Sequence, residues 1–160
     1  MKLMKKYNLI NKSEKLFILI SILGLLPFII GLLDLLINKN NLFFFVNLPK
    51  YYGSIIFTFL GAIYWGAMLN LPPKSLIPEK IKFFIIIWSV VPSIMGITVL
   101  SIKSNFSLLM LSLGFLLCQL VDEIFNKYLS FPNWYLPLRR ILTLIVVIVL
   151  ICSYFIIQTP

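Results

Sequence analysis

The residues of this chain that could carry chemistry lie mainly near the ends of long apolar runs. Two acidic neighbours, Asp122 and Glu123, stand shortly before two basic neighbours, Arg139 and Arg140. The simplest expectation is an ion-pair group that ties two helices together at a membrane boundary. If Asp122 were instead buried against Gln119 and desolvated, it could serve in a proton relay. Both interpretations follow from these five residues.

Patterns typical of catalysis or metal binding are weak in this sequence. The chain has no histidine, no phosphate-binding glycine loop, and no Ser/Lys or Asp/Asp arrangement of the intramembrane-protease type. Cys118 and Cys152 both fall within apolar runs, so we expect packing residues rather than a disulfide or a metal pair. We therefore expect a protein that is not an enzyme, with no catalytic residue, no metal and no cofactor.

The tryptophans supply the strongest candidates for binding. Trp134 is placed to anchor the chain at the headgroup level. Trp65 and Trp88 lie deeper in their runs, where packing is the plainer role and ligand stacking the alternative. Together with nearby polar residues they give one candidate ligand or partner site. Its members are Trp65, Asn70, Trp88, Ser93, Gln119, Asp122, Trp134 and Arg139.

The composition shows which elements must position these residues. Hydrophobic residues make up 61% of the 160, charged residues only 12%, and the mean hydropathy is +1.03. A bilayer core needs roughly 20 apolar residues of helix. Five runs of about that length occur, at 16–37, 52–71, 83–102, 106–121 and 140–157. They are apolar on every face rather than alternating, which excludes barrel strands.

We therefore predict an all-α fold, a polytopic helical bundle with five transmembrane helices that forms a single transmembrane domain over residues 1–160. The lysines before the first run resemble the start of a signal peptide. That run is too long, however, and no small-x-small cleavage site follows it, so we expect an uncleaved span.

Lysine and arginine predict the orientation, since positive charge is retained on the cytoplasmic side. Eleven of these residues lie before the first run, after the second and after the fourth: Lys2, Lys5, Lys6, Lys12, Lys15, Lys74, Lys80, Lys82, Lys127, Arg139 and Arg140. Only Lys39, Lys50 and Lys103 lie on the other side. We expect the N-terminus inside and the C-terminus outside. The net charge of +9 needs no nucleic-acid partner, because the bias and attraction to anionic lipid headgroups explain it.

Small residues mark the expected packing faces of the helices. In lipid they let helix backbones approach closely, and Ala62 with Gly66 is a small-xxx-small pair of this kind. The expected packing residues are Gly61, Ala62, Gly66, Ser89, Gly96 and Gly114. Spans two, three and four should thus form the packed centre, while the uniformly bulky fifth should face more lipid.

Four stretches in this order resemble the transmembrane protein 69-like family. They are FLGAIYWG at 59–66, WSVVPS at 88–93, GFLLCQLVD at 114–122 and PNWYLPLRRILT at 132–143. The chain departs from the family pattern at Ala62 and Tyr64, where relatives often have a second glycine and a histidine or other polar residue. The resemblance implies a small multi-span membrane protein and brings no established activity with it.

Two functions remain open from the sequence. The first is a non-enzymatic membrane component that binds a protein partner, as a homo-oligomer or as an accessory subunit. The alternative is a carrier or receptor for a small apolar ligand, in a cytoplasm-facing pocket bounded by Trp65, Trp88 and Gln119. Only two of the 14 basic residues are arginine, as expected from an AT-rich genome, and no arginine-rich transit segment is present. We therefore expect a bacterial inner (plasma) membrane.

Overall fold

The computed structural model describes residues 12–37, 43–72, 75–129 and 131–158. Over these residues the chain is all-helical, with α1 Lys12–Leu23, α2 Leu26–Ile37, α3 Phe43–Leu69, α4 Glu79–Ser101, α5 Phe106–Phe125 and α6 Tyr135–Gln158. α1 and α2 together form one span, and this span and each of the other four helices are long and apolar enough to cross a membrane. The predicted fold class is confirmed. Five of the lysines that predict the orientation lie outside the described residues: Lys2, Lys5, Lys6, Lys39 and Lys74.

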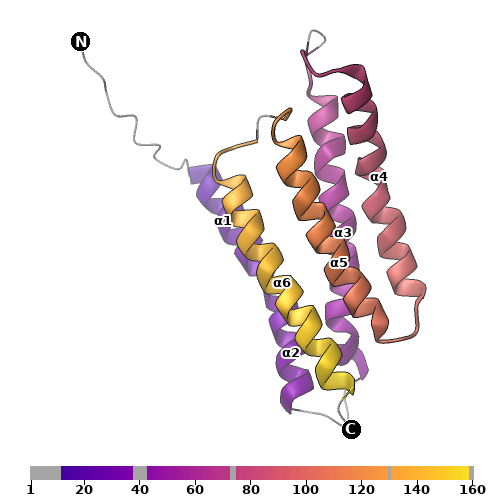
Figure 1. Ribbon diagram of the computed structural model, residues 1–160. Helices are drawn as coiled ribbons and strands as arrows, with labels where there is room; N and C mark the ends of the chain where they lie inside the picture. Colours follow the sequence, from indigo (N-terminus) through magenta and orange to yellow (C-terminus); the bar gives the residue numbers. More distant parts are fainter. Residues whose placement is uncertain (1–11, 38–42, 73–74, 130, 159–160) are drawn as a thin grey trace.

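The five spans run alternately up and down the bundle (Figure 1). The start of α1, the turn from α3 to α4 and the turn from α5 to α6 lie at one end. The turn from α4 to α5 lies at the opposite end, where α6 also finishes. Hydrogen bonding within each helix satisfies the backbone, which hydrocarbon surroundings demand.

The first span is broken at Gly24 and Leu25, which the sequence prediction did not include. Pro27 has no backbone N–H, and its ring would collide with the carbonyl of the residue four positions earlier. A single tighter turn forms instead, in which the N–H of Leu25 donates to the carbonyl of Ile22 at 3.0 Å. α1 and α2 therefore run in slightly different directions, and both line the cavity described below.

α3 and α4 approach each other closely at two glycines. A Cβ added to Gly61 would lie 2.5 Å from the carbonyl oxygen of Ser89, and one added to Gly96 would lie 2.8 Å from Thr58 Cγ2. Pro92 lies beside Gly61 and is buried, and α4 runs through it without a break. Because glycine has no side chain, α3 and α4 can pack backbone to backbone at these two points, as helices in lipid often do.

α5 is the most deeply buried span of the bundle, and α6 packs along it. The expectation that the fifth span faces more lipid than spans two to four is wrong, because α6 is as buried as α3 and more buried than α4. The buried residues of α6 are Arg139, Thr143, Val146, Val147, Val149, Leu150 and Ser153. The branched side chains on this face are compact, so they fill the space against α5 and α2 instead of projecting into lipid.

Each of the five spans extends beyond the apolar run that predicted it, and α3, α5 and α6 do so where the polar residues lie. α3 begins at Phe43 rather than near residue 52, α5 continues to Phe125, and α6 begins at Tyr135 rather than near residue 140. The added turns are the ones that carry polar and aromatic side chains. Hydropathy detects the part of a helix inside hydrocarbon, whereas the helix itself continues until its backbone bonds end.

Candidate functional site

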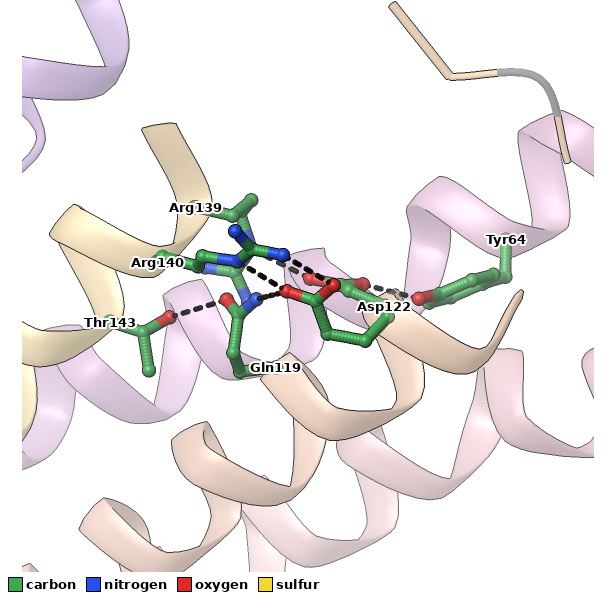
Figure 2. Close-up of polar contacts among 7 residues, drawn as sticks. Tyr64, Gln119, Asp122, Arg139, Arg140 and Thr143 are labelled. Carbon is green, nitrogen blue, oxygen red and sulfur yellow. Dashed lines mark hydrogen bonds and ion pairs between the residues drawn. The ribbon is translucent and has the colours of Figure 1, made fainter. Parts of the chain in front are cut away.

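The centre of the polar site is the buried carboxylate of Asp122 on α5, which is bonded to two other helices (Figure 2). Arg139 on α6 donates from Nε to Asp122 Oδ2 at 2.9 Å, and the hydroxyl of Tyr64 on α3 donates to Asp122 Oδ1. The three residues are 3%, 8% and 1% exposed, in the order Asp122, Arg139 and Tyr64. One carboxylate thus joins α3, α5 and α6 where water is excluded.

A second polar group lies one residue further along both helices, nearer the surface of the bundle. Arg140 donates to both oxygens of Glu123, at 2.6 and 2.8 Å. Gln119 donates to Glu123 Oε1 at 2.9 Å and accepts a bond from Thr143 at 3.4 Å. The ion-pair group expected between the two acidic and the two basic neighbours is therefore present. Gln119 belongs to its outer part rather than to Asp122.

Aromatic side chains pack around the ring of Tyr64, whose hydroxyl donates to Asp122. The ring of Tyr64 meets those of Phe125 and Phe131 edge to face, at centroid distances of 5.5 and 6.2 Å. Phe131 in turn contacts Tyr135 at 4.8 Å, and Leu129 is 4% exposed. These apolar neighbours of Tyr64 lower the local dielectric around its bond to Asp122, which strengthens that bond.

The remaining predicted site residues do not all join this group. Trp65 is 53% exposed on α3, in a shallow groove shared with Met68, Leu69, Ile86 and Ser89. Trp88 packs half-buried against the hydrophobic core, and Trp134 stacks on Phe17 of α1 at 6.4 Å. Since Gln119 bonds Glu123 and Thr143, the three side chains expected to bound one pocket have different neighbours. Asn70 is exposed and donates to the carbonyl of Gly66, and Ser93 is half-buried on α4.

The predicted packing residues also divide into two sets. Gly61, Ser89, Gly96 and Gly114 lie at helix contacts, and a Cβ on Gly114 would be 2.8 Å from the ring of Phe57. Ala62 is exposed, and a Cβ on Gly66 would meet nothing within 4 Å. Within the described part of the chain, the pair Ala62 and Gly66 therefore packs against no other helix, which corrects the expectation for these two residues.

Cysteine and acidic side chains are not grouped as metal ligands usually are. Among the described residues, no three histidine, cysteine, aspartate or glutamate side chains come together in a group that could hold a metal ion. Cys118 is a buried free thiol near Asp122 and Arg139, and Cys152 is a free, exposed thiol on α6. The packing role expected for the cysteines therefore fits Cys118 and does not fit Cys152.

Comparison with protein families gives a match over most of the chain. Residues 13–155 match the model of DUF3429, described as a protein of unknown function. The chain belongs to this family. The matched range reaches into all five spans and includes the whole polar site. No curated protein and no solved structure matches the chain significantly.

Sequence reasoning missed Tyr64 as a member of the site. In the sequence, Tyr64 stands out only as a departure from the pattern of the transmembrane protein 69-like family. The packed face of the second span was predicted at other residues. The signal was present in the spacing, because Phe57, Gly61 and Tyr64 follow one another at intervals of four and three and all are buried. Continuing the face by one more step from Gly61 would have reached Tyr64.

Proposed function

We propose that this member of the family is a non-enzymatic component of the membrane that binds a protein partner through the outer face of α3 and α4. The observation that carries the proposal is the outward pair Ala62 and Gly66. A glycine facing lipid weakens a helix without improving its packing. In membranes, small residues at this spacing favour close approach of another helix. The groove beside them has a volume of about 220 Å³ and is lined by Trp65, Met68, Leu69, Ile86 and Ser89.

The polar site supports the non-enzymatic part of the proposal. Both oxygens of Asp122 accept bonds from neighbouring helices, and Glu123 is bonded by Arg140 and Gln119. A carboxylate engaged in this way is well placed to cross-link helices and poorly placed to meet a substrate. The proton-relay hypothesis is less favoured, because Asp122 is buried and both of its oxygens already accept bonds from Tyr64 and Arg139.

We also propose that the N-terminus is cytoplasmic, the C-terminus lies outside, and the membrane is a bacterial inner membrane. The support is the distribution of positive charge. Lys12, Lys15, Lys80, Lys82 and Lys127 belong to the bundle end that also carries the polar site. The assignment to the transmembrane protein 69-like family is likewise a proposal, and it rests on the four sequence stretches quoted above.

Site-specific photo-cross-linking in native membranes tests the partner proposal. A photoreactive amino acid at position 62 should give a discrete adduct, whereas one at Leu144, which is 60% exposed on α6, should label lipid only. An adduct of twice the monomer mass identifies a second copy, and another discrete mass identifies a different membrane protein. Gly66→Leu should remove the adduct by blocking close approach. Lipid labelling alone at both positions would rule the proposal out.

A further inference from the structure

On another side of the bundle, a cavity of about 270 Å³ lies among α1, α2, α3, α5 and α6. Most of its walls are apolar, including Leu25, Phe28, Ile56, Leu60, Phe115 and Val146. Its volume is close to the lower end of the roughly 300–1,000 Å³ usual for small-molecule sites. Two of its lining residues, Ile20 and Phe59, are 57% and 64% exposed. A molecule dissolved in the bilayer could therefore enter between α1 and α3.

Polar side chains also line the cavity, namely Ser21, Tyr52, Tyr135, Arg139 and Thr143. Arg139 and Tyr135 both line it, and they lie close to each other. Arg139 Nη2 and the hydroxyl of Tyr135 are buried and lie near each other, and neither makes a well-formed hydrogen bond with a described residue. Buried donors without acceptors are costly, since each loses its bonds to water. Both donors are thus available to an oxygen atom of a bound molecule.

The charges around these donors indicate which kind of oxygen would fit. The positive charge of Arg139 is already balanced by Asp122 at 2.9 Å, and that of Arg140 by Glu123. A further anion would leave an uncompensated negative charge away from water, which is expensive. An uncharged acceptor such as an ester, ketone or quinone carbonyl would satisfy both donors at no such cost.

We propose that this cavity binds an uncharged, mainly apolar molecule whose carbonyl oxygen accepts hydrogen bonds from Arg139 and Tyr135. The apolar body lies along Phe28, Ile56 and Leu60, and the carbonyl points toward α6. The cavity shares no lining residue with the groove of the partner proposal, and the two proposals are tested by different measurements. It also differs from the pocket predicted from the sequence, because Trp65, Trp88 and Gln119 do not line it.

Three probes of equal chain length test the ligand class by native mass spectrometry of the purified protein. Methyl laurate carries a neutral carbonyl, laurate carries a negative charge, and 1-dodecene has no acceptor. Methyl laurate should bind about fivefold more tightly than 1-dodecene, as expected for one net hydrogen bond of about 1 kcal/mol. Laurate should bind more weakly than methyl laurate at neutral pH. Equal binding of methyl laurate and 1-dodecene, tighter binding of laurate, or no binding at all would overturn the proposal.

Two variants locate the site. Tyr135→Phe removes a hydroxyl that makes no well-formed hydrogen bond, so the protein should keep its melting temperature while methyl laurate binds about fivefold more weakly. Val146→Phe fills the cavity and should abolish binding of methyl laurate and 1-dodecene alike. Ile148→Phe makes the same kind of enlargement at an outward position, 51% exposed, and should leave binding unchanged. Unchanged affinity in Tyr135→Phe would rule out the carbonyl contact even if Val146→Phe fails to fold.

Discussion

Arg139 Nε lies 2.9 Å from Asp122 Oδ2, and the side chains of the two residues are 9% and 4% exposed. Tyr64 completes the contact from a third helix. An ion pair in such surroundings has little water to replace a lost partner. The contact therefore fixes how α5 and α6 lie against each other, and substitution of either residue should disturb their relative position.

Removing the cation should strongly destabilise the bundle. Arg139→Met leaves Asp122 buried without its counter-charge, and breaking a buried pair in this way costs about 3–5 kcal/mol. Thermal unfolding in detergent micelles, followed by circular dichroism, should show a large fall in melting temperature. Arg140→Met, at an exposed pair, should change it little. Equal effects of the two substitutions would show that the buried pair has no special role.

Loss of the tyrosine hydroxyl should have a smaller effect. Tyr64→Phe keeps the ring against Phe125 and Phe131 and removes only the bond to Asp122. Hydrogen bonds between membrane helices are worth about 1 kcal/mol, so the free energy of unfolding should fall by that amount. Unfolding in mixed micelles with increasing dodecyl sulfate measures it. Tyr128→Phe, which alters a 38% exposed side chain, is the matched control. A loss as large as that of Arg139→Met would mean that Tyr64 does more than donate this bond.

The two neighbouring glycines of α3 should respond in opposite directions to the same substitution. Gly61→Ala puts a Cβ 2.5 Å from the carbonyl of Ser89, so α4 must shift at a cost of about 1–3 kcal/mol. Gly66→Ala meets nothing within 4 Å and should stabilise the detergent-solubilised monomer by up to about 1 kcal/mol. Unfolding of both variants in dodecyl sulfate gives the comparison. If Gly61→Ala proved harmless, the close packing of α3 on α4 would not hold in solution.

The orientation can be read with a reporter enzyme that is active only outside the cytoplasm. Fusions after Ser104 and after Pro160 should be active, whereas a fusion after Leu76 should be inactive, because positive charge retains that turn inside. Reversing the signs of Lys80 and Lys82 should weaken the bias without changing the helices. Activity of the Leu76 fusion alone would invert the proposed topology.

Much of the fold could be predicted, because lipid imposes a simple rule on sequence. Each run of about 20 apolar residues became a span, and the matched order of Asp122, Glu123, Arg139 and Arg140 correctly indicated an ion-pair group. Whether Ala62 and Gly66 contact another helix of the chain could not be predicted in the same way. A small residue permits close approach on whichever face it lies, and the sequence does not say whether a neighbouring helix of the same chain occupies that face.

The sequence by itself determined the class of protein, the number of spans and the pairing of charge between α5 and α6, since hydrophobic length and local spacing decide these. Only the tertiary structure decided that Tyr64 bonds Asp122, that Trp65 faces outward, and that α6 lines a cavity with Arg139 and Tyr135. These outcomes depend on the rotation of each helix about its axis and on the break near Pro27. Both are set by how all the helices pack together, and neither is encoded in any single run of residues.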